Sequence, residues 1–208
     1  MTDTNVLTID DIADVRAYER ERSEFLRYVI ALKARRRVSV GPMVTVVFEN
    51  RDTVRFQIQE MARVEKLISD EAIQTELDIY NMLIPAPGEL CATMFVELTS
   101  EFALREWLPR LVGIERAAAL QLADGSEIRS APEDHHADQL TDDTTTASVH
   151  YIRYAFTPAQ VNAFRAGPVT LRVDHPNYTE HTVLRPETVA ELRGDLRGSS
   201  SRPALQGS

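Results

Sequence analysis

His150 is the side chain of this sequence best suited to proton transfer near neutral pH, because imidazole titrates in that range. It stands in the run SVHYIRYAF, where strand alternation would place it on one face with Ile152 and Tyr154. Arg153 would then project from the opposite face. The pattern allows two interpretations: a core histidine that bonds a backbone carbonyl, or a general base or metal ligand.

Three acids stand alone beside or within apolar runs, where burying an unpaired carboxylate would be costly. Glu97 lies in MFVELT, Glu115 lies in VGIERAAAL, and Glu60 lies at the edge of an apolar helical stripe. If the strands that carry Glu97 and Glu115 pair, their carboxylates and His150 would form a site suited to iron, manganese or zinc. Each acid could instead pair with one of the many arginines.

The segment DHPNY places His175 and Tyr178 in a turn between two expected strands. Such turns often carry functional groups, although Pro and Asn are also ordinary turn residues. A hypothesis follows in which one pocket is lined by Glu60, Glu97, Glu115, His150, Arg153, His175 and Tyr178. In this pocket His150 would be the base or ligand, the acids would bind a cation, and Arg153 would hold an anionic substrate. The pattern identifies no particular metal, cofactor or substrate.

Several standard sites are excluded by their missing motifs. The sequence has no glycine-rich phosphate loop, no HExxH, no CxxC and no GxSxG. Cys91 is the single cysteine, so no intrachain disulfide can form, and its apolar surroundings predict a buried side chain. The net charge of −9 argues against binding to nucleic acid.

The charge is distributed unevenly along the chain. Residues 16–37 contain eight cations and three acids, whereas residues 131–150 contain five acids and neither Lys nor Arg. This polarity could orient an encounter with a partner, or it could reflect two solvated faces.

The elements that must position these residues are helices first and mainly strands afterwards. Thr8, Asp14, Asp52 and Ser69 are the expected N-caps of the early helices. We expect early helices over 8–37, in a short and a long segment, and over 52–68 and 69–80. We expect strands over 38–49, 90–98, 114–123, 127–129, 147–156, 168–174 and 178–184. We expect short later helices over 101–108, 157–165 and 186–196, and an acidic loop over 131–146.

Tight turns between neighbouring strands indicate an antiparallel arrangement. The predicted fold class is therefore α+β, with N-terminal helices packed on a mainly antiparallel sheet. We expect a single domain over 1–196 and a disordered Ser/Gly/Pro-rich tail over 197–208. The first residues do not resemble a signal peptide, and no apolar run reaches the roughly 18 residues that span a bilayer. We therefore expect a cytoplasmic protein without a membrane partner.

Several stretches together resemble an uncharacterised bacterial family of unknown function, notably FENRDTVRFQIQEM, SVHYIRY and VDHPNY. The resemblance extends from Leu7 to about Leu196. Genes of this family tend to lie beside genes for rubrerythrin-like proteins and iron–sulfur oxidoreductases. The resemblance therefore implies an accessory or binding protein of an iron-dependent redox or oxidative-stress system, with a rubrerythrin-like or iron–sulfur protein as partner. It implies no catalytic residue, so a metal-binding protein or enzyme with the Glu/His/Arg pocket stays the alternative.

Overall fold

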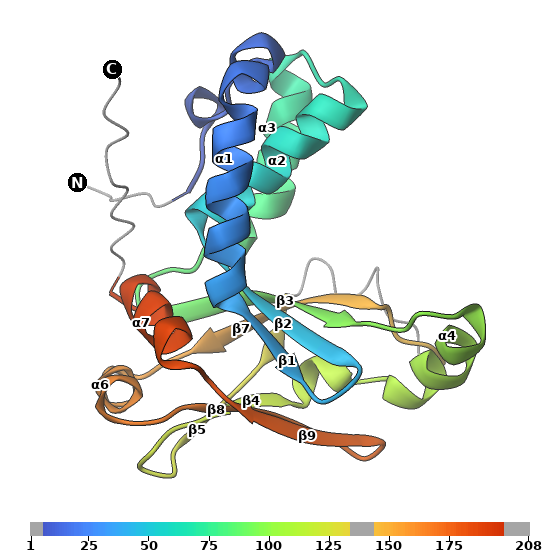
Figure 1. The fold of residues 1–208 in the computed structure, drawn as a ribbon, viewed down its shortest axis with the longest axis vertical. Coiled ribbons are helices and arrows are strands. Elements are labelled where there is room, and N and C mark those ends of the chain that lie inside the picture. The colour runs from blue at the N-terminus through green and yellow to red at the C-terminus, as the bar shows by residue number, and fades with distance from the viewer. Residues whose placement is uncertain (1–5, 134–143, 198–208) are drawn as a thin grey trace.

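The N-terminal helices rise from one side of two stacked sheets (Figure 1). The structure is a computed structural model that describes residues 6–133 and 144–197. A short 3-10 helix, η1 (Ile9–Asp11), precedes the long α1 (Val15–Arg36). Helix α2 (Arg51–Glu65) packs beside it, α3 (Asp70–Tyr80) packs against α2, and η2 (Asn81–Leu83) follows α3.

Side-chain caps fix where these helices begin. The Asp14 carboxylate accepts hydrogen bonds from the first amides of α1, and the Ser69 hydroxyl does so for α3, as predicted. The predicted N-cap of α2 was wrong, because Asn50 rather than Asp52 caps that helix and exchanges hydrogen bonds with Thr53. The helix expected over 52–68 is present as α2, and it ends three residues earlier than predicted.

The strands form two antiparallel sheets rather than one. The five-stranded sheet has the order β1-β2-β3-β7-β6. Its strands are β1 (Arg37–Val40), β2 (Val44–Glu49), β3 (Glu89–Val96), β7 (Val149–Ala155) and β6 (Ala131–Pro132). The four-stranded sheet has the order β5-β4-β8-β9. Its strands are β4 (Ala118–Gln121), β5 (Glu127–Arg129), β8 (Thr170–His175) and β9 (Tyr178–Val183).

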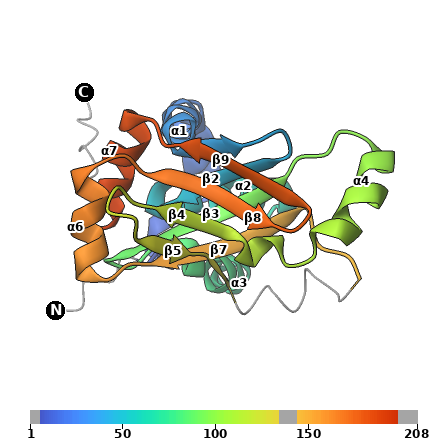
Figure 2. The same ribbon diagram turned by 90° about the horizontal axis from the view of Figure 1, so that it is seen from below.

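Short helices close the two ends of the stacked sheets. Figure 2 shows α6 (Pro158–Ala166) and α7 (Pro186–Asp195) at one end and α4 (Glu101–Trp107) at the other. Two 3-10 turns, η3 (Leu108–Leu111) and η4 (Ile114–Arg116), follow α4. The prediction of a strand beginning at residue 114 was therefore wrong at its start, where η4 stands. The expected acidic loop contains β6, and its residues 134–143 lie outside the described residues.

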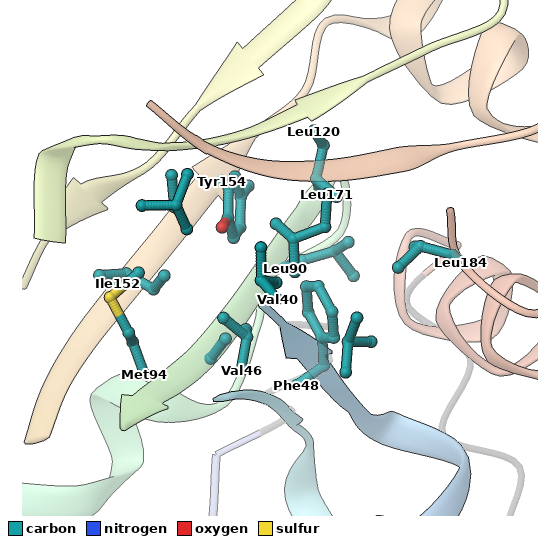
Figure 3. Close-up of a cluster of buried hydrophobic side chains, with 14 of the residues drawn as sticks. Val40, Val46, Phe48, Leu90, Met94, Leu120, Ile152, Tyr154, Leu171 and Leu184 are labelled. Atoms are coloured by element: carbon teal, nitrogen blue, oxygen red, sulfur yellow. The ribbon is translucent and has the colours of Figure 1, made fainter. Parts of the chain in front are cut away.

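Strand alternation divides the five-stranded sheet into two unlike faces. One face, with Val46, Phe48, Leu90, Met94 and Ile152, packs against side chains of the four-stranded sheet to form the main core (Figure 3). The opposite face, which carries Thr93 and Tyr151, is covered in part by the helices. A second apolar cluster joins the helices through residues such as Val54, Ile58 and Leu77.

The predicted fold class is confirmed: N-terminal helices accompany antiparallel strands in an α+β arrangement. Among the helices that the structure describes, none is both long and apolar enough to cross a bilayer. Except for Arg197, the expected tail at 197–208 lies outside the described residues.

Candidate functional site

His150 lies on the core face of β7, opposite Met94 of β3, and only 4% of its surface is exposed. Its Nε2 atom lies 2.8 Å from the Ala147 carbonyl oxygen and 3.1 Å from the Thr146 hydroxyl. Burial lowers the pKa of His150, because the imidazolium loses its hydration there, while the nearby charge of Glu115 acts in the opposite direction. The neutral imidazole therefore donates to a backbone carbonyl, as a core histidine does.

Glu115 is the predicted site residue that comes closest to His150. It lies in η4 and is 9% exposed, and its Oε1 atom lies 3.8 Å from the Arg116 guanidinium. Its Oε2 atom is buried and has no hydrogen-bond partner in the described parts of the chain. Because η4 replaces the expected strand start, Glu115 does not face Glu97 across a strand pair.

Glu97 lies just after β3, half exposed to solvent and remote from the core face. Its two carboxylate oxygens bind the Arg37 guanidinium and the Thr45 hydroxyl, each at 2.8 Å. This ion pair is the alternative that the sequence left open for the lone acids.

Glu60 lies among the helices, where α2 packs against α1. It accepts hydrogen bonds from the Tyr18 hydroxyl at 2.7 Å, from Arg22 at 2.8 Å and from Arg63 at 3.0 Å. These donors hold the pKa of the Glu60 carboxyl at about 2, with the Arg22 hydrogen bond contributing most. Tyr18 and Arg63 also line a hollow of about 260 Å³ near the start of α1.

Arg153 lies on the helix-facing side of β7, as the alternation predicted. Its guanidinium binds Glu89 at 2.6 Å, Glu133 at 2.6 Å and the Met82 carbonyl at 3.1 Å. Cys91 lies nearby, and burial raises the pKa of its thiol to about 12, which confirms it as a buried side chain. With both carboxylates already bound, Arg153 is a structural ion-pair centre.

His175 and Tyr178 close the turn between β8 and β9. The His175 ring bonds the Val112 carbonyl oxygen at 3.0 Å and accepts from the Asn177 amide at 3.2 Å. The Tyr178 hydroxyl donates to the Val40 carbonyl oxygen at 2.5 Å and accepts from the Met43 amide at 3.1 Å. Both side chains therefore join the turn to neighbouring backbone.

The seven predicted residues thus do not line one pocket. Glu115 and His150 are neighbours, and His175 and Tyr178 share a turn, but the others have separate partners. Within residues 6–133 and 144–197, no group of three or more His, Cys, Asp or Glu side chains is arranged to hold a metal ion.

A cavity of about 150 Å³ lies elsewhere, where the helices meet the five-stranded sheet. We call it the junction pocket. The sheet contributes side chains from β2, β3 and β7, all on the helix-facing side: Glu49, Thr93, Phe95, Val149 and Tyr151. Strand register explains their proximity, since Thr93 pairs with Tyr151 and Phe95 pairs with Val149 across β3 and β7.

The helices contribute the rest of the junction pocket, including Lys33 from the last turns of α1, Gln57 from α2 and Tyr80 from the end of α3. Gln57 lies close enough to the Tyr80 hydroxyl to oppose the rise of its pKa. Burial raises the pKa of both Tyr80 and Tyr151, so their phenols stay protonated at neutral pH. The pocket therefore combines an acid, a cation, phenols and an apolar wall.

Comparison with known proteins places the chain in a family. The model of a family described as a protein of unknown function, DUF3501, matches residues 6–196. The chain belongs to the DUF3501 family. A crystal structure of a protein of unknown function from Burkholderia pseudomallei K96243 is similar, with 34% sequence identity and a TM-score of 0.86. The match covers 92% of this chain and 99% of that chain. No curated protein matches at a significant level.

Sequence reasoning missed the junction pocket of this DUF3501 chain because it followed the wrong face of β7. Strand alternation places His150 on one face of β7 and Tyr151 and Arg153 on the other. The predicted site was centred on His150, which faces the core. Polar residues at alternate positions of β2 and β3, such as Thr45 with Glu49, carry the same signal. The pattern of a single strand does not show which helices cover that face, because this depends on the tertiary packing.

Proposed function

We propose that this chain is a cytoplasmic accessory protein that binds a partner in an iron-dependent redox or oxidative-stress system. The partner is a rubrerythrin-like or iron–sulfur protein, as the family resemblance implies. Glu60, Glu97 and Arg153 each form an ion pair with a different residue of the chain. Because these charged groups are paired within the fold and not directed at a common substrate, they support a binding role.

The observation that carries this proposal is a basic stripe on α1. Arg16, Arg20 and Arg27 recur at spacings that place them on one face of the helix, and all three are exposed. None of them forms a salt bridge with the part of the chain that the structure describes. Since α1 rises clear of the sheets (Figure 1), this stripe is accessible to an acidic surface on a partner.

Co-purification from the native cell tests the proposal. We expect the tagged chain to recover a rubrerythrin-like or iron–sulfur protein, identified by mass spectrometry, and to lose it as salt is raised, because salt screens exposed charges. The variant Arg20→Glu with Arg27→Glu should recover much less. The matched control reverses Arg105 and Arg129, which are equally exposed on other elements, and should recover the usual amount.

Repeated recovery of no partner would contradict the proposal. Equal recovery by the two double variants would show that the basic stripe does not form the contact.

The alternative is a metal-binding or enzymatic role that uses His150 and Glu115. The observation in its favour is the buried Glu115 Oε2 atom, which lacks a hydrogen-bond partner among the described residues. Elemental analysis of protein purified without an affinity tag tests it. Stoichiometric metal that is lost in His150→Ala would support this role, whereas substoichiometric metal unchanged by that substitution would exclude it.

A further inference from the structure

Glu49 is a buried acid in the junction pocket that forms no salt bridge with the described residues. It is the last residue of β2, and only 7% of the residue is exposed. Its Oε1 atom accepts a hydrogen bond of 2.7 Å from the Thr93 hydroxyl, but no described cation lies within salt-bridge distance. Arg36 lies next to Glu49, but its guanidinium donates to the Glu49 backbone carbonyl and not to the carboxylate.

The free energy cost of burying such a carboxylate is offset when a cation binds it. A second acid near the end of α1, Asp195, has a mostly buried side chain and is bound by Arg36. Glu49 therefore stands apart as an acid that is directed into a cavity and has its charge uncompensated.

Lys33 is a cation that lines the same cavity. It is one of two lysines in a chain with 23 lysine and arginine residues. The next three cations of the helix end, Arg35, Arg36 and Arg37, each form a salt bridge, whereas Lys33 forms none with the described residues. Lys33 and Glu49 both line the pocket but do not bind each other.

The walls between these two charges suit a small organic molecule. Tyr80 and Tyr151 present protonated phenols, and Phe95 and Val149 present apolar surface. Aromatic rings also attract ammonium groups through their π-electrons. A cavity of about 150 Å³ accommodates a ligand of roughly the size of benzene.

We propose that the junction pocket binds a small zwitterion of the α-amino-acid class. The ammonium group of the ligand binds the Glu49 carboxylate, and the carboxylate of the ligand binds the Lys33 ammonium. Ligands of the size of glycine, alanine and serine fit the volume of the cavity.

Ligand-observed NMR and isothermal titration calorimetry on the full chain test this proposal, with alanine, glycine and serine as probes. Propionate lacks the ammonium group of alanine, and ethylamine lacks the carboxylate. We expect saturable binding of at least one amino acid and binding at least ten-fold weaker for propionate and ethylamine.

Two conservative variants connect the binding to the pocket. Glu49→Gln retains an acceptor for the Thr93 hydroxyl, and Lys33→Met retains the aliphatic stem, so both should fold. Each should raise the dissociation constant of the amino acid at least ten-fold. The controls Glu97→Gln and Lys66→Met change the same residue types outside the pocket and should leave it unchanged.

Circular dichroism and thermal unfolding confirm that each variant is folded before binding is compared. Absence of binding by all three amino acids at millimolar concentration would overturn the proposal. The proposal would also be overturned if the folded Glu49→Gln and Lys33→Met variants bound the amino acid as tightly as the native chain does. Binding of propionate and ethylamine as tight as that of the amino acid would overturn it as well.

Discussion

Glu60 connects α1 and α2 through hydrogen bonds to Tyr18, Arg22 and Arg63. Its pKa falls from the ordinary 4.5 to about 2, so the folded state holds the ionised form more strongly than the unfolded state does. Glu60 therefore stabilises the fold above pH 4.5, and this contribution is lost as the pH falls towards 2. Because the site is partly solvated, we expect Glu60→Gln to lower the free energy of unfolding by about 1–2 kcal/mol at pH 7.

Urea denaturation of the native chain and the variant at pH 7, 4 and 3 measures this effect. The difference between the two should shrink as the pH falls. Glu97→Gln is the control, because its ion pair is exposed and is worth about 0–1 kcal/mol. A Glu60→Gln effect that is constant with pH would contradict the pKa shift.

His150 is a base and Glu60 is an acid, but both should make the folded chain less stable as the pH falls. Burial lowers its pKa from the ordinary 6.5, so below that pH the unfolded chain binds a proton that the folded chain resists. Stability should therefore fall as the pH falls below 6.5. We expect the melting temperature to drop between pH 7.5 and 5.5, and to drop less in His150→Gln.

His181→Gln provides the matched control, because His181 is exposed on β9. It should retain the full drop in melting temperature. Identical pH profiles for the native chain and His150→Gln would show that the imidazole titrates alike in the folded and unfolded states.

The end of α1 is bound to α7 by a buried arginine. The Arg36 side chain is fully buried and donates to the Phe48 carbonyl oxygen at 2.8 Å and to the Asp195 carboxylate. Burial raises the pKa of the Asp195 carboxyl, and the charge of Arg36 opposes this rise. Replacing Arg36 therefore removes the cation that stabilises this mostly buried carboxylate. We expect Arg36→Met to lower the free energy of unfolding by about 3–5 kcal/mol.

The neighbouring Arg35 offers a control with the same substitution. Its ion pair with Glu191 is more exposed, with 42% and 23% of the two side chains accessible to solvent, so Arg35→Met should cost about 0–1 kcal/mol in chemical denaturation. Combining Arg36→Met with Asp195→Asn should restore part of the loss. Equal costs for the two arginine substitutions would refute a special role for Arg36.

The two sheets meet where β9 lies beside the turn that joins β1 to β2. The Tyr178 hydroxyl binds the Val40 carbonyl oxygen there, and Gly41 follows with a φ of +67°. A Cβ atom at Gly41 would lie 2.5 Å from that hydroxyl and 2.4 Å from Glu180 Cγ. Gly41→Ala would therefore strain the backbone and displace the contact between the sheets.

We expect Gly41→Ala to cost at least about 1 kcal/mol more than Gly125→Ala in chemical denaturation. Gly125 also has a positive φ, +85°, but has open space around it, so its variant reports backbone strain alone. If Gly41→Ala and Gly125→Ala lowered the free energy of unfolding equally, the close contact of the added Cβ atom at Gly41 would have no energetic cost.

Local signals predicted most elements of this fold and little of its site. The predicted caps at Asp14 and Ser69 depend on near neighbours, and the structure has both of them. The division into two sheets depends on pairings such as Leu120 with Leu171, which local patterns do not contain. The ion pairs of Arg36 are also absent from local patterns, because its acidic partners lie on α7.

The partnership of Arg36 with α7 has a consequence for biosynthesis. Glu191 and Asp195 lie 155 and 159 residues after Arg36 in the sequence, so a ribosome completes both sheets before it adds α7. Until then, the nascent chain carries an uncompensated guanidinium at the position where α1 enters the core. The ion pairs that join the end of α1 to α7 can therefore form only after almost all of the described chain has been synthesised.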